Sequence, residues 1–248
     1  MSVSPSCFLP TILLVSALGC QVVDPSASES GTTGGSIFEM APEPATEPRR
    51  ITLEGGVVVS VDGGRVEIPG WIALSEGWLE VAACRQGTRE HEAIVTSVTL
   101  PSVVHSGLLL AGFTPGSPAR YRVDGPPLAA TGDPIEVDLI FEADGRRVTL
   151  PLGEAIDDER GEATPRWVFA GSGFRPNPPS LGPGEFYVAD YAGTLVGLTT
   201  FGDEMIAAVE VRSPEIGVDA PVWQIRPGVL PSVGTPVTMV FRRPDSSD

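Results

Sequence analysis

Glycine and proline are the residues that most constrain how this chain can fold. The 248 residues include 29 glycines and 25 prolines, together more than a fifth of the chain. Both residues are disfavoured inside helices and frequent in turns, so this composition favours many short strands over long helices. The sequence therefore predicts a predominantly β fold, a β-rich sandwich or a barrel-like structure, with one short α-helix near residues 101–111.

Runs of β-forming residues separated by turn residues support this fold class. Val57–Val61, the turn Asp62-Gly63-Gly64 and Arg65–Ile68 together predict a hairpin. An apolar stripe with a proline at its start and a glycine after its end predicts a helix over Pro101–Ala111. Further strands are predicted at Ile51–Leu53, Glu80–Cys84, Glu90–Val98, Glu136–Glu142, Arg147–Leu150, Arg166–Ala170, Gly184–Ala189, Thr194–Thr200, Ala207–Arg212 and Thr235–Arg242.

The charge of the chain excludes one class of partner. It has 32 acidic and 16 basic residues, all of the latter arginine, for a net charge of −16. Such a chain repels a phosphate backbone, so we expect no nucleic-acid partner. With 42% hydrophobic and 19% charged residues, it can bury a core.

The N-terminal region has the pattern of an export signal. Phe8–Leu18 is an uncharged apolar run of about 11 residues, far shorter than the roughly 20 that span a membrane. The sequence Ala17-Leu18-Gly19-Cys20 resembles the site cleaved by the bacterial lipoprotein signal peptidase, and Cys20 would then carry the lipid. Ala17 stands where that site usually has leucine, and no basic residue precedes Phe8. An ordinary cleavable signal or an uncleaved tail remains the alternative.

These features divide the chain into four parts. Residues 1–19 are predicted to be a signal peptide, and residues 20–48 a lipid-anchored flexible tether. From Gln21 to Pro48 the chain has five acids, no base and few large apolar residues, too few to offset the entropy of ordering. Residues 49–243 form the predicted β-rich domain, and residues 244–248 a tail. We therefore expect a protein exported to the periplasm or cell envelope and held at the membrane through Cys20.

One predicted hairpin brings together residues with reactive side chains. Cys7 and Cys20 lie in the export segment, so Cys84 is alone in the mature domain and has no disulfide partner there. If Gln86-Gly87 is a two-residue turn, Cys84 and His91 share a face as diagonal neighbours about 7–8 Å apart. The carboxylates of Glu90 and Glu92 then lie on the opposite face.

These residues, with His105 in the first turn of the predicted helix, allow two kinds of chemistry. Cys84, His91 and His105 are candidate ligands of a divalent metal such as zinc, although their spacing matches no standard zinc motif. Cys84 and His91 could instead form a thiolate–imidazole pair, oriented by Glu90 or Glu92. The alternative is purely structural: a buried thiol, hydrogen-bonded imidazoles and a solvated acidic face.

Other motifs are weaker. Gly171-Ser172-Gly173 resembles part of a nucleophile elbow but lacks the full G-x-S-x-G pattern. The acidic run Asp157–Glu159, with Glu162, lacks the ligand spacing of a calcium loop and is interpreted as an acidic surface turn. Four aromatic residues could line a carbohydrate site or belong to the core: Trp167, Trp223, Tyr187 and Tyr191.

The folded part also carries a series of short motifs in a fixed order. They are Val66–Gly70, Gly77–Cys84, Gly87–Glu92, Pro101–Phe113, Pro115-Gly116, Trp167–Phe174, Tyr187–Asp190, Gly193 and Gly234–Val237. Together they resemble the YdjY-domain family of exported bacterial proteins, over about residues 55–243. The resemblance implies a conserved domain of unknown activity. Some relatives carry an iron–sulfur module, but one cysteine in the mature domain cannot supply the four thiolates of such a cluster.

No complete catalytic set accompanies these features, and the sequence therefore favours a non-catalytic protein. We expect an exported, lipid-anchored binding or interaction module, whose ligand, a protein or a small molecule, is unknown. The alternative is a metal- or thiol-dependent hydrolase centred on His91 with Cys84 and His105.

Overall fold

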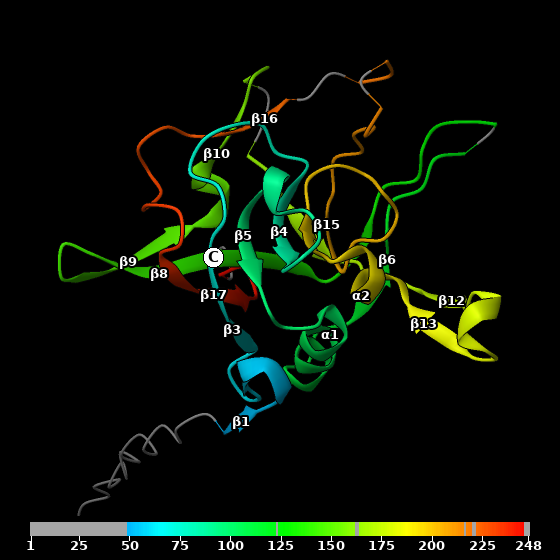
Figure 1. Ribbon diagram of the computed structural model, residues 1–248, viewed down its shortest axis with the longest axis horizontal. Helices are drawn as coiled ribbons and strands as arrows, with labels where there is room; N and C mark the ends of the chain where they lie inside the picture. The colour runs from blue at the N-terminus through cyan, green and yellow to red at the C-terminus, as the bar shows by residue number, and fades with distance from the viewer. Residues whose placement is uncertain (1–48, 123, 162–163, 216, 220–221, 246–248) are drawn as a thin grey trace, which may run out of the picture. The chain divides into compact units, whose positions relative to one another are not determined.

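The computed structural model of the chain describes residues 49–122, 124–161, 164–215, 217–219 and 222–245. Its main sheet closes into an eight-stranded barrel, in which neighbouring strands follow the order β3-β17-β8-β11-β15-β14-β4-β5 and β5 pairs again with β3 (Figure 1). This closure confirms the predominantly β, barrel-like fold. The barrel strands are β3 (Arg65–Ile72), β4 (Val81–Arg85), β5 (Ala93–Ser97), β8 (Pro134–Ala143), β11 (Trp167–Phe169), β14 (Thr194–Gly197), β15 (Ile206–Ala208) and β17 (Pro236–Arg242).

Other strands extend the barrel or form small pairs beside it. β1 and β2 continue the sheet from β3, and β9 pairs with β8. The remaining strands pair as β6–β7, β10–β16 and β12–β13. Their bounds are β1 (Arg50–Thr52), β2 (Val58–Ser60), β6 (Pro115–Ser117), β7 (Thr131–Gly132), β9 (Arg146–Pro151), β10 (Ile156–Asp158), β12 (Phe174–Pro176), β13 (Glu185–Tyr187) and β16 (Trp223–Ile225).

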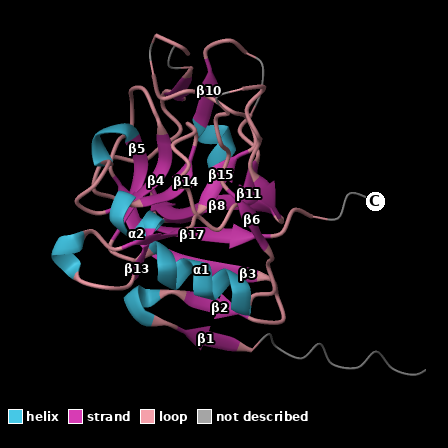
Figure 2. Ribbon diagram, turned by 90° about the vertical axis from the view of Figure 1, so that its right-hand side faces the viewer, coloured by secondary structure: helices cyan, strands magenta, loops and turns pink. Residues whose placement is uncertain are grey.

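Two α-helices, α1 (Pro101–Leu110) and α2 (Val188–Ala192), accompany four short 3-10 helices in the described residues. Helix α1 lies against β2 and β3 (Figure 2). A side chain on Gly107 would come within 3.3 Å of Val57 and Val59, so glycine lets the helix approach the sheet closely. The 3-10 helices are η1 (Glu54–Gly56), η2 (Glu90–Glu92), η3 (Leu152–Ala155) and η4 (Pro179–Leu181).

The local predictions agree with most of these elements. The hairpin between β2 and β3 forms as expected, with Ser60 opposite Arg65 across the turn. The predicted helix begins at Pro101 and ends one residue earlier than expected. The strand predicted over Gly184–Ala189 is wrong in its second half, because the chain turns into α2 after Tyr187.

Two pairs of adjacent barrel strands are parallel, and one of these pairs contradicts the predicted antiparallel hairpin. β4 and β5 run parallel, with Val81 opposite Ala93 and Cys84 opposite Thr96. The antiparallel hairpin about Gln86-Gly87 is therefore wrong. The chain does turn at Gly87, whose φ is 83°, but it continues through η2 before β5 begins. β14 and β15 are the other parallel pair.

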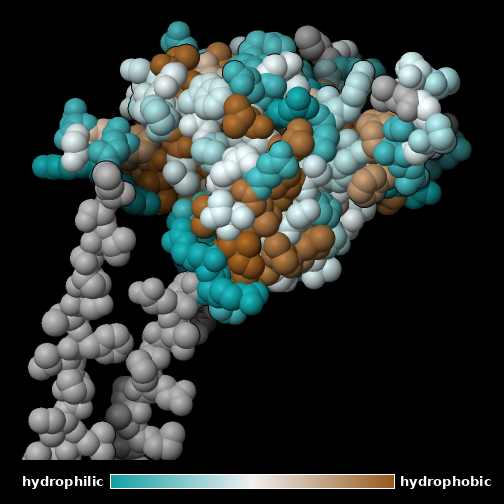
Figure 3. Space-filling model, turned by 60° about the horizontal axis from the view of Figure 1, so that its bottom comes forward, coloured by the Kyte–Doolittle hydropathy of each residue, from teal (hydrophilic) through white to brown (hydrophobic). Residues whose placement is uncertain are grey.

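The main core cluster combines apolar side chains of the long strands β3, β8 and β17 with those on the buried face of α1. The other side of α1 leaves apolar surface uncovered. Leu109 and Leu110 are 47% and 45% exposed, and apolar residues gather on the side of the molecule where α1 lies (Figure 3).

In the described part of the chain, no helix has the length and apolar character needed to cross a membrane.

Candidate functional site

Cys84 lies in the wall of the barrel and is completely buried. Its neighbours across the sheet are Thr194 in β14 and Thr96 in β5, and Phe201 packs against the small apolar cluster that contains it. Burial raises the pKa of the Cys84 thiol, so the neutral form is favoured. This environment is that of an inert core thiol.

His91 lies in a different environment. It is in η2, and its side chain is 78% exposed, with Nε2 at 3.7 Å from a carboxylate oxygen of Glu92. The carboxylate of Glu90 accepts a hydrogen bond from the backbone N–H of Gly87, which holds the turn after β4. Because β4 and β5 are parallel, Cys84 and His91 are not cross-strand neighbours, and one is buried where the other is exposed. The predicted thiol–imidazole pair does not form.

His105 belongs to a third environment, between α1 and the segment before β12. Its Nδ1 lies 2.9 Å from the Tyr187 hydroxyl, which donates its hydrogen to the carbonyl of Gly171 at 3.0 Å. Nδ1 must therefore carry the hydrogen of the imidazole and donate it to the tyrosine oxygen. The ring packs edge-on against Phe169, with centroids 4.9 Å apart. Burial lowers the pKa of His105, which favours a neutral ring that holds α1 and β13 together.

The three candidate ligands thus lie in separate environments. Within the described residues, no group of three or more histidine, cysteine, aspartate and glutamate side chains could hold a metal ion.

Most of the weaker candidates have structural partners. Trp167 is buried and its indole N–H donates to the carbonyl of Gly197 at 3.0 Å, while Trp223 is 1% exposed in the core. Asp157 forms an ion pair with Arg226 at 2.8 Å. Glu162, by contrast, lies outside the described residues.

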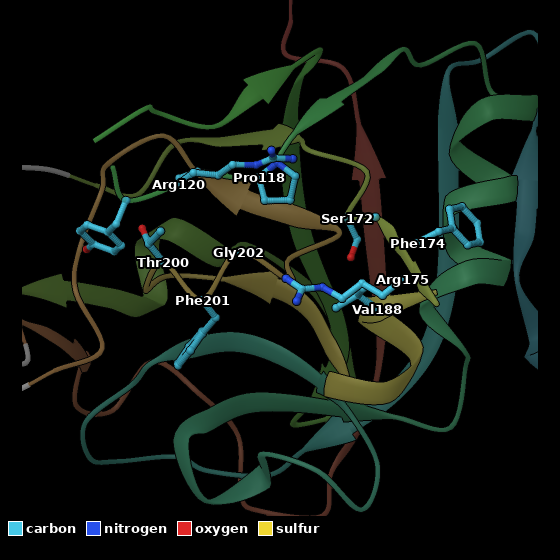
Figure 4. Close-up of a pocket in the computed structure, with 12 residues that line it drawn as sticks. Pro118, Arg120, Ser172, Phe174, Arg175, Val188, Thr200, Phe201 and Gly202 are labelled. Carbon is cyan, nitrogen blue, oxygen red and sulfur yellow. The ribbon is translucent and has the colours of Figure 1, made fainter. Parts of the chain in front are cut away.

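A polar cleft of about 430 Å³ is lined by two arginines and by none of the predicted residues Cys84, His91 and His105. Arg120 follows β6, and Arg175 is the middle residue of β12. Figure 4 shows the Arg175 side chain extending across the cleft toward Gly202, with the Ser172 hydroxyl directed into the same space. We call this space the arginine cleft. Its lining is Pro118, Ala119, Arg120, Tyr121, Ser172, Gly173, Phe174, Arg175, Val188, Thr200, Phe201 and Gly202.

The two guanidinium groups differ from most others in the protein. Several other arginines pair with carboxylates, as Arg242 does with Asp138 at 2.7 Å. Neither Arg120 nor Arg175 has a carboxylate partner among the residues that the structure describes. Two guanidinium groups that line one cleft without a carboxylate partner are an arrangement that suits an anionic group.

Ser172 holds a strained position at the edge of this cleft. Its φ is 52°, a left-handed conformation that is uncommon for residues other than glycine. The backbone N–H donates to the carbonyl of Glu204 at 3.0 Å, and the hydroxyl donates to the carbonyl of Asp203 at 2.7 Å. Strained residues that are held by several contacts cluster at binding and active sites.

A charged layer supports the floor of the cleft. The Arg89 guanidinium lies 3.8 Å from the centre of the Phe201 ring and pairs with Asp203 at 3.3 Å. The Glu204 carboxylate is buried and accepts hydrogen bonds from the backbone N–H groups of Phe201 and Gly202. Burial raises the pKa of Glu204 to about 7, and the neighbouring charge of Asp203 adds to this effect. The loop of residues 200–202 is thus held from beneath by Arg89 and Glu204.

Sequence reasoning did not identify the two arginines, because no motif contains them and their separation in the chain is large. The one local signal was Gly171-Ser172-Gly173, which places a serine between two glycines. The structure assigns this segment to the cleft wall and not to a strand-to-helix nucleophile elbow.

The comparisons with known proteins bear on the whole domain. No curated protein and no solved structure matches the chain significantly. The family model of the YdjY domain matches residues 57–242, a range that contains the complete barrel, α1 and every residue of the arginine cleft. The motifs that run from β3 to β17 are those of one family, and the chain belongs to the YdjY domain family.

Proposed function

We propose that the protein is a lipid-anchored binding module of the bacterial cell envelope, and that the arginine cleft holds a ligand with a carboxylate or phosphate group. The observation that carries the ligand site is the pair Arg120 and Arg175, two guanidinium groups without carboxylate partners that line one cavity. Guanidinium groups bind carboxylates and phosphates through paired charge-assisted hydrogen bonds. The Thr200 hydroxyl lines the same cavity and can donate its hydrogen to the anion, whereas the Ser172 hydroxyl already donates to the carbonyl of Asp203.

The envelope location is supported by the apolar run and Cys20 at the N-terminus and by the polar composition of residues 21–48. A tether of this composition would let the domain reach ligands at some distance from the membrane. Separation of Cys84, His91 and His105 removes the geometric basis for a thiol- or metal-dependent hydrolase at these residues.

Titration of the full-length chain with inorganic phosphate and with acetate tests the ligand site. We expect saturable binding by isothermal calorimetry, and a loss of about tenfold in affinity when Arg120→Gln or Arg175→Gln removes a charge-assisted hydrogen bond. Arg146→Gln is the matched control, because Arg146 is an exposed arginine in β9 that does not line the cleft. Absence of binding, or equal affinities in all three variants, would refute the proposal.

A further inference from the structure

A second cavity of about 820 Å³ lies beside the arginine cleft, between the β12–β13 hairpin and α2. Prolines and aromatic rings supply most of its lining, so it presents mainly apolar surface. We call this cavity the aromatic groove. Its lining residues are Arg85, Arg175, Pro176, Pro178, Phe186, Tyr187, Asp190 and Tyr191.

The groove and the cleft share a wall. Arg175 lines both cavities, and its side chain extends into the cleft (Figure 4). Phe174, which lines the cleft, packs against Tyr187, which lines the groove, with ring centroids 5.3 Å apart. A ligand that pairs with Arg175 in the cleft can therefore extend into the groove without crossing an unrelated surface.

The other charged groups of the groove already have partners. The Arg85 guanidinium donates to the backbone carbonyl of Asp190 at 2.9 Å. The Asp190 carboxylate accepts the backbone N–H of Ser102 at 2.8 Å, at the first turn of α1. Arg175 is the charged side chain that lines both the groove and the cleft, and prolines and aromatic rings make up most of the remaining groove lining.

The most exposed part of the groove is aromatic. Tyr191 is 82% exposed and lies edge-on to Phe186, with ring centroids 5.7 Å apart. Phe174 on the cleft side is 67% exposed. Large exposed rings beside a cavity are typical of ligand-binding surfaces, because they gain free energy when apolar groups cover them.

The charge of the whole chain limits which anions can bind. A net charge of −16 repels a polymer that carries many negative charges, whereas a ligand with one anionic group gains more from two arginines than it loses. The combination of a small cationic cleft with an adjoining apolar groove fits an amphipathic molecule with a single charged head.

On these grounds we infer that the ligand is a small amphipathic anion. Its carboxylate or phosphate head pairs with Arg120 and Arg175 in the arginine cleft, and its apolar body lies along Tyr191 and Phe186 in the aromatic groove. This inference rests on the proposed function and names the class of ligand for the same site.

Calorimetric titrations of the full-length chain with acetate, decanoate, decyl phosphate and decanol, below their aggregation concentrations, test the inference. Burying methylene groups strengthens binding by about fourfold for each group. We therefore expect decanoate to bind at least a hundredfold more tightly than acetate, and decanol to bind at least tenfold more weakly than decanoate. Decyl phosphate in place of decanoate shows which anionic head the cleft prefers, and tight binding of either one supports the inference.

Two variants locate the binding. Tyr191→Ala should weaken decanoate binding at least tenfold and leave acetate binding unchanged, because the ring contacts only the apolar body. Arg175→Gln should weaken both. Leu109→Ala, which removes an exposed apolar side chain from α1, is the matched control and should change neither.

The outcomes separate the inference from the proposal on which it rests. If acetate binds through the arginines but decanoate binds no more tightly, the amphipathic ligand is refuted and the anion site stands. Decanoate binding that Tyr191→Ala leaves unchanged, or decanol binding as tight as that of decanoate, also refutes the inference. If none of the anions binds, both ideas fail.

Discussion

Glu204 offers a direct test of how the floor of the arginine cleft is held. The residue is 1% exposed, and its carboxylate accepts hydrogen bonds from the N–H groups of Phe201 and Gly202. Burial, with a smaller contribution from Asp203, raises its pKa from 4.5 to about 7. In the variant Glu204→Gln, the amide oxygen can accept the same hydrogen bonds without ever acquiring a charge.

The raised pKa fixes the sign and size of the effect. Between the unfolded and folded pKa values, the folded state holds a proton on Glu204 that the unfolded state has released, so stability falls as pH rises through this window. A pKa difference between 4.5 and about 7 corresponds to about 3 kcal/mol of unfolding free energy. The penalty is absent below about pH 4.5 and complete above about pH 7.

The assay compares the unfolding free energies of wild type and Glu204→Gln in urea at pH 5 and pH 8. The variant should gain about 2.5 kcal/mol relative to wild type between the two pH values, because a small part of the penalty is already present at pH 5 and groups common to both proteins cancel. Glu76→Gln, at an exposed loop position, is the control and should show no such gain. If the difference between Glu204→Gln and wild type does not change with pH, Glu204 is charged in the folded protein and the reasoning is wrong.

Four further outcomes follow from other parts of the molecule. Cys20→Ala should release the protein from the membrane fraction in cell fractionation; equal release of wild type would disprove the lipid anchor. Deleting residues 21–48 should leave the melting temperature within error, because the segment lacks core-forming residues; a fall of several degrees would show that it packs on the domain. Cys84 should resist alkylation until unfolding, and Cys84→Ala should cost about 1 kcal/mol in denaturant titrations; rapid labelling of the native protein would contradict this. Gly193→Ala should cost about 2 kcal/mol or more in the same titrations, because Gly193 has a φ of 81° and its added Cβ would overlap the Thr88 side chain; unchanged stability would show that the turn relaxes freely.

Local signals in the sequence determined several elements of this protein. The turn Asp62-Gly63-Gly64 is enough to form the β2–β3 hairpin, because the strands it joins are adjacent in the chain. Pro101 sets the start of α1 by the same kind of short-range effect. The many glycines and prolines limited the length of regular elements, and the order of short motifs identified the family.

The pairing of the strands around Cys84 could not be predicted from local sequence signals. A short connection after β4 normally predicts an antiparallel hairpin. Instead, β5 runs parallel to β4. On its other side, β5 pairs with the last two residues of β3, Trp71 and Ile72. Closing the barrel requires this placement, and closure depends on strands more than a hundred residues apart, such as β4 and β14. The choice between parallel and antiparallel neighbours is therefore made by the whole sheet and not by the turn.

The candidate site depends on the tertiary structure still more strongly. Arg120, Arg175 and the loop of residues 200–202 come from three separate segments of the chain, and no local pattern links them. They meet because the segment at Gly171-Ser172 is hydrogen-bonded to residues 203–205 beside the barrel. Sequence alone determined the β-rich class and the family, since these follow from composition and short-range order. Only the folded barrel decided which side chains share a cavity, because that depends on contacts between residues distant in the chain.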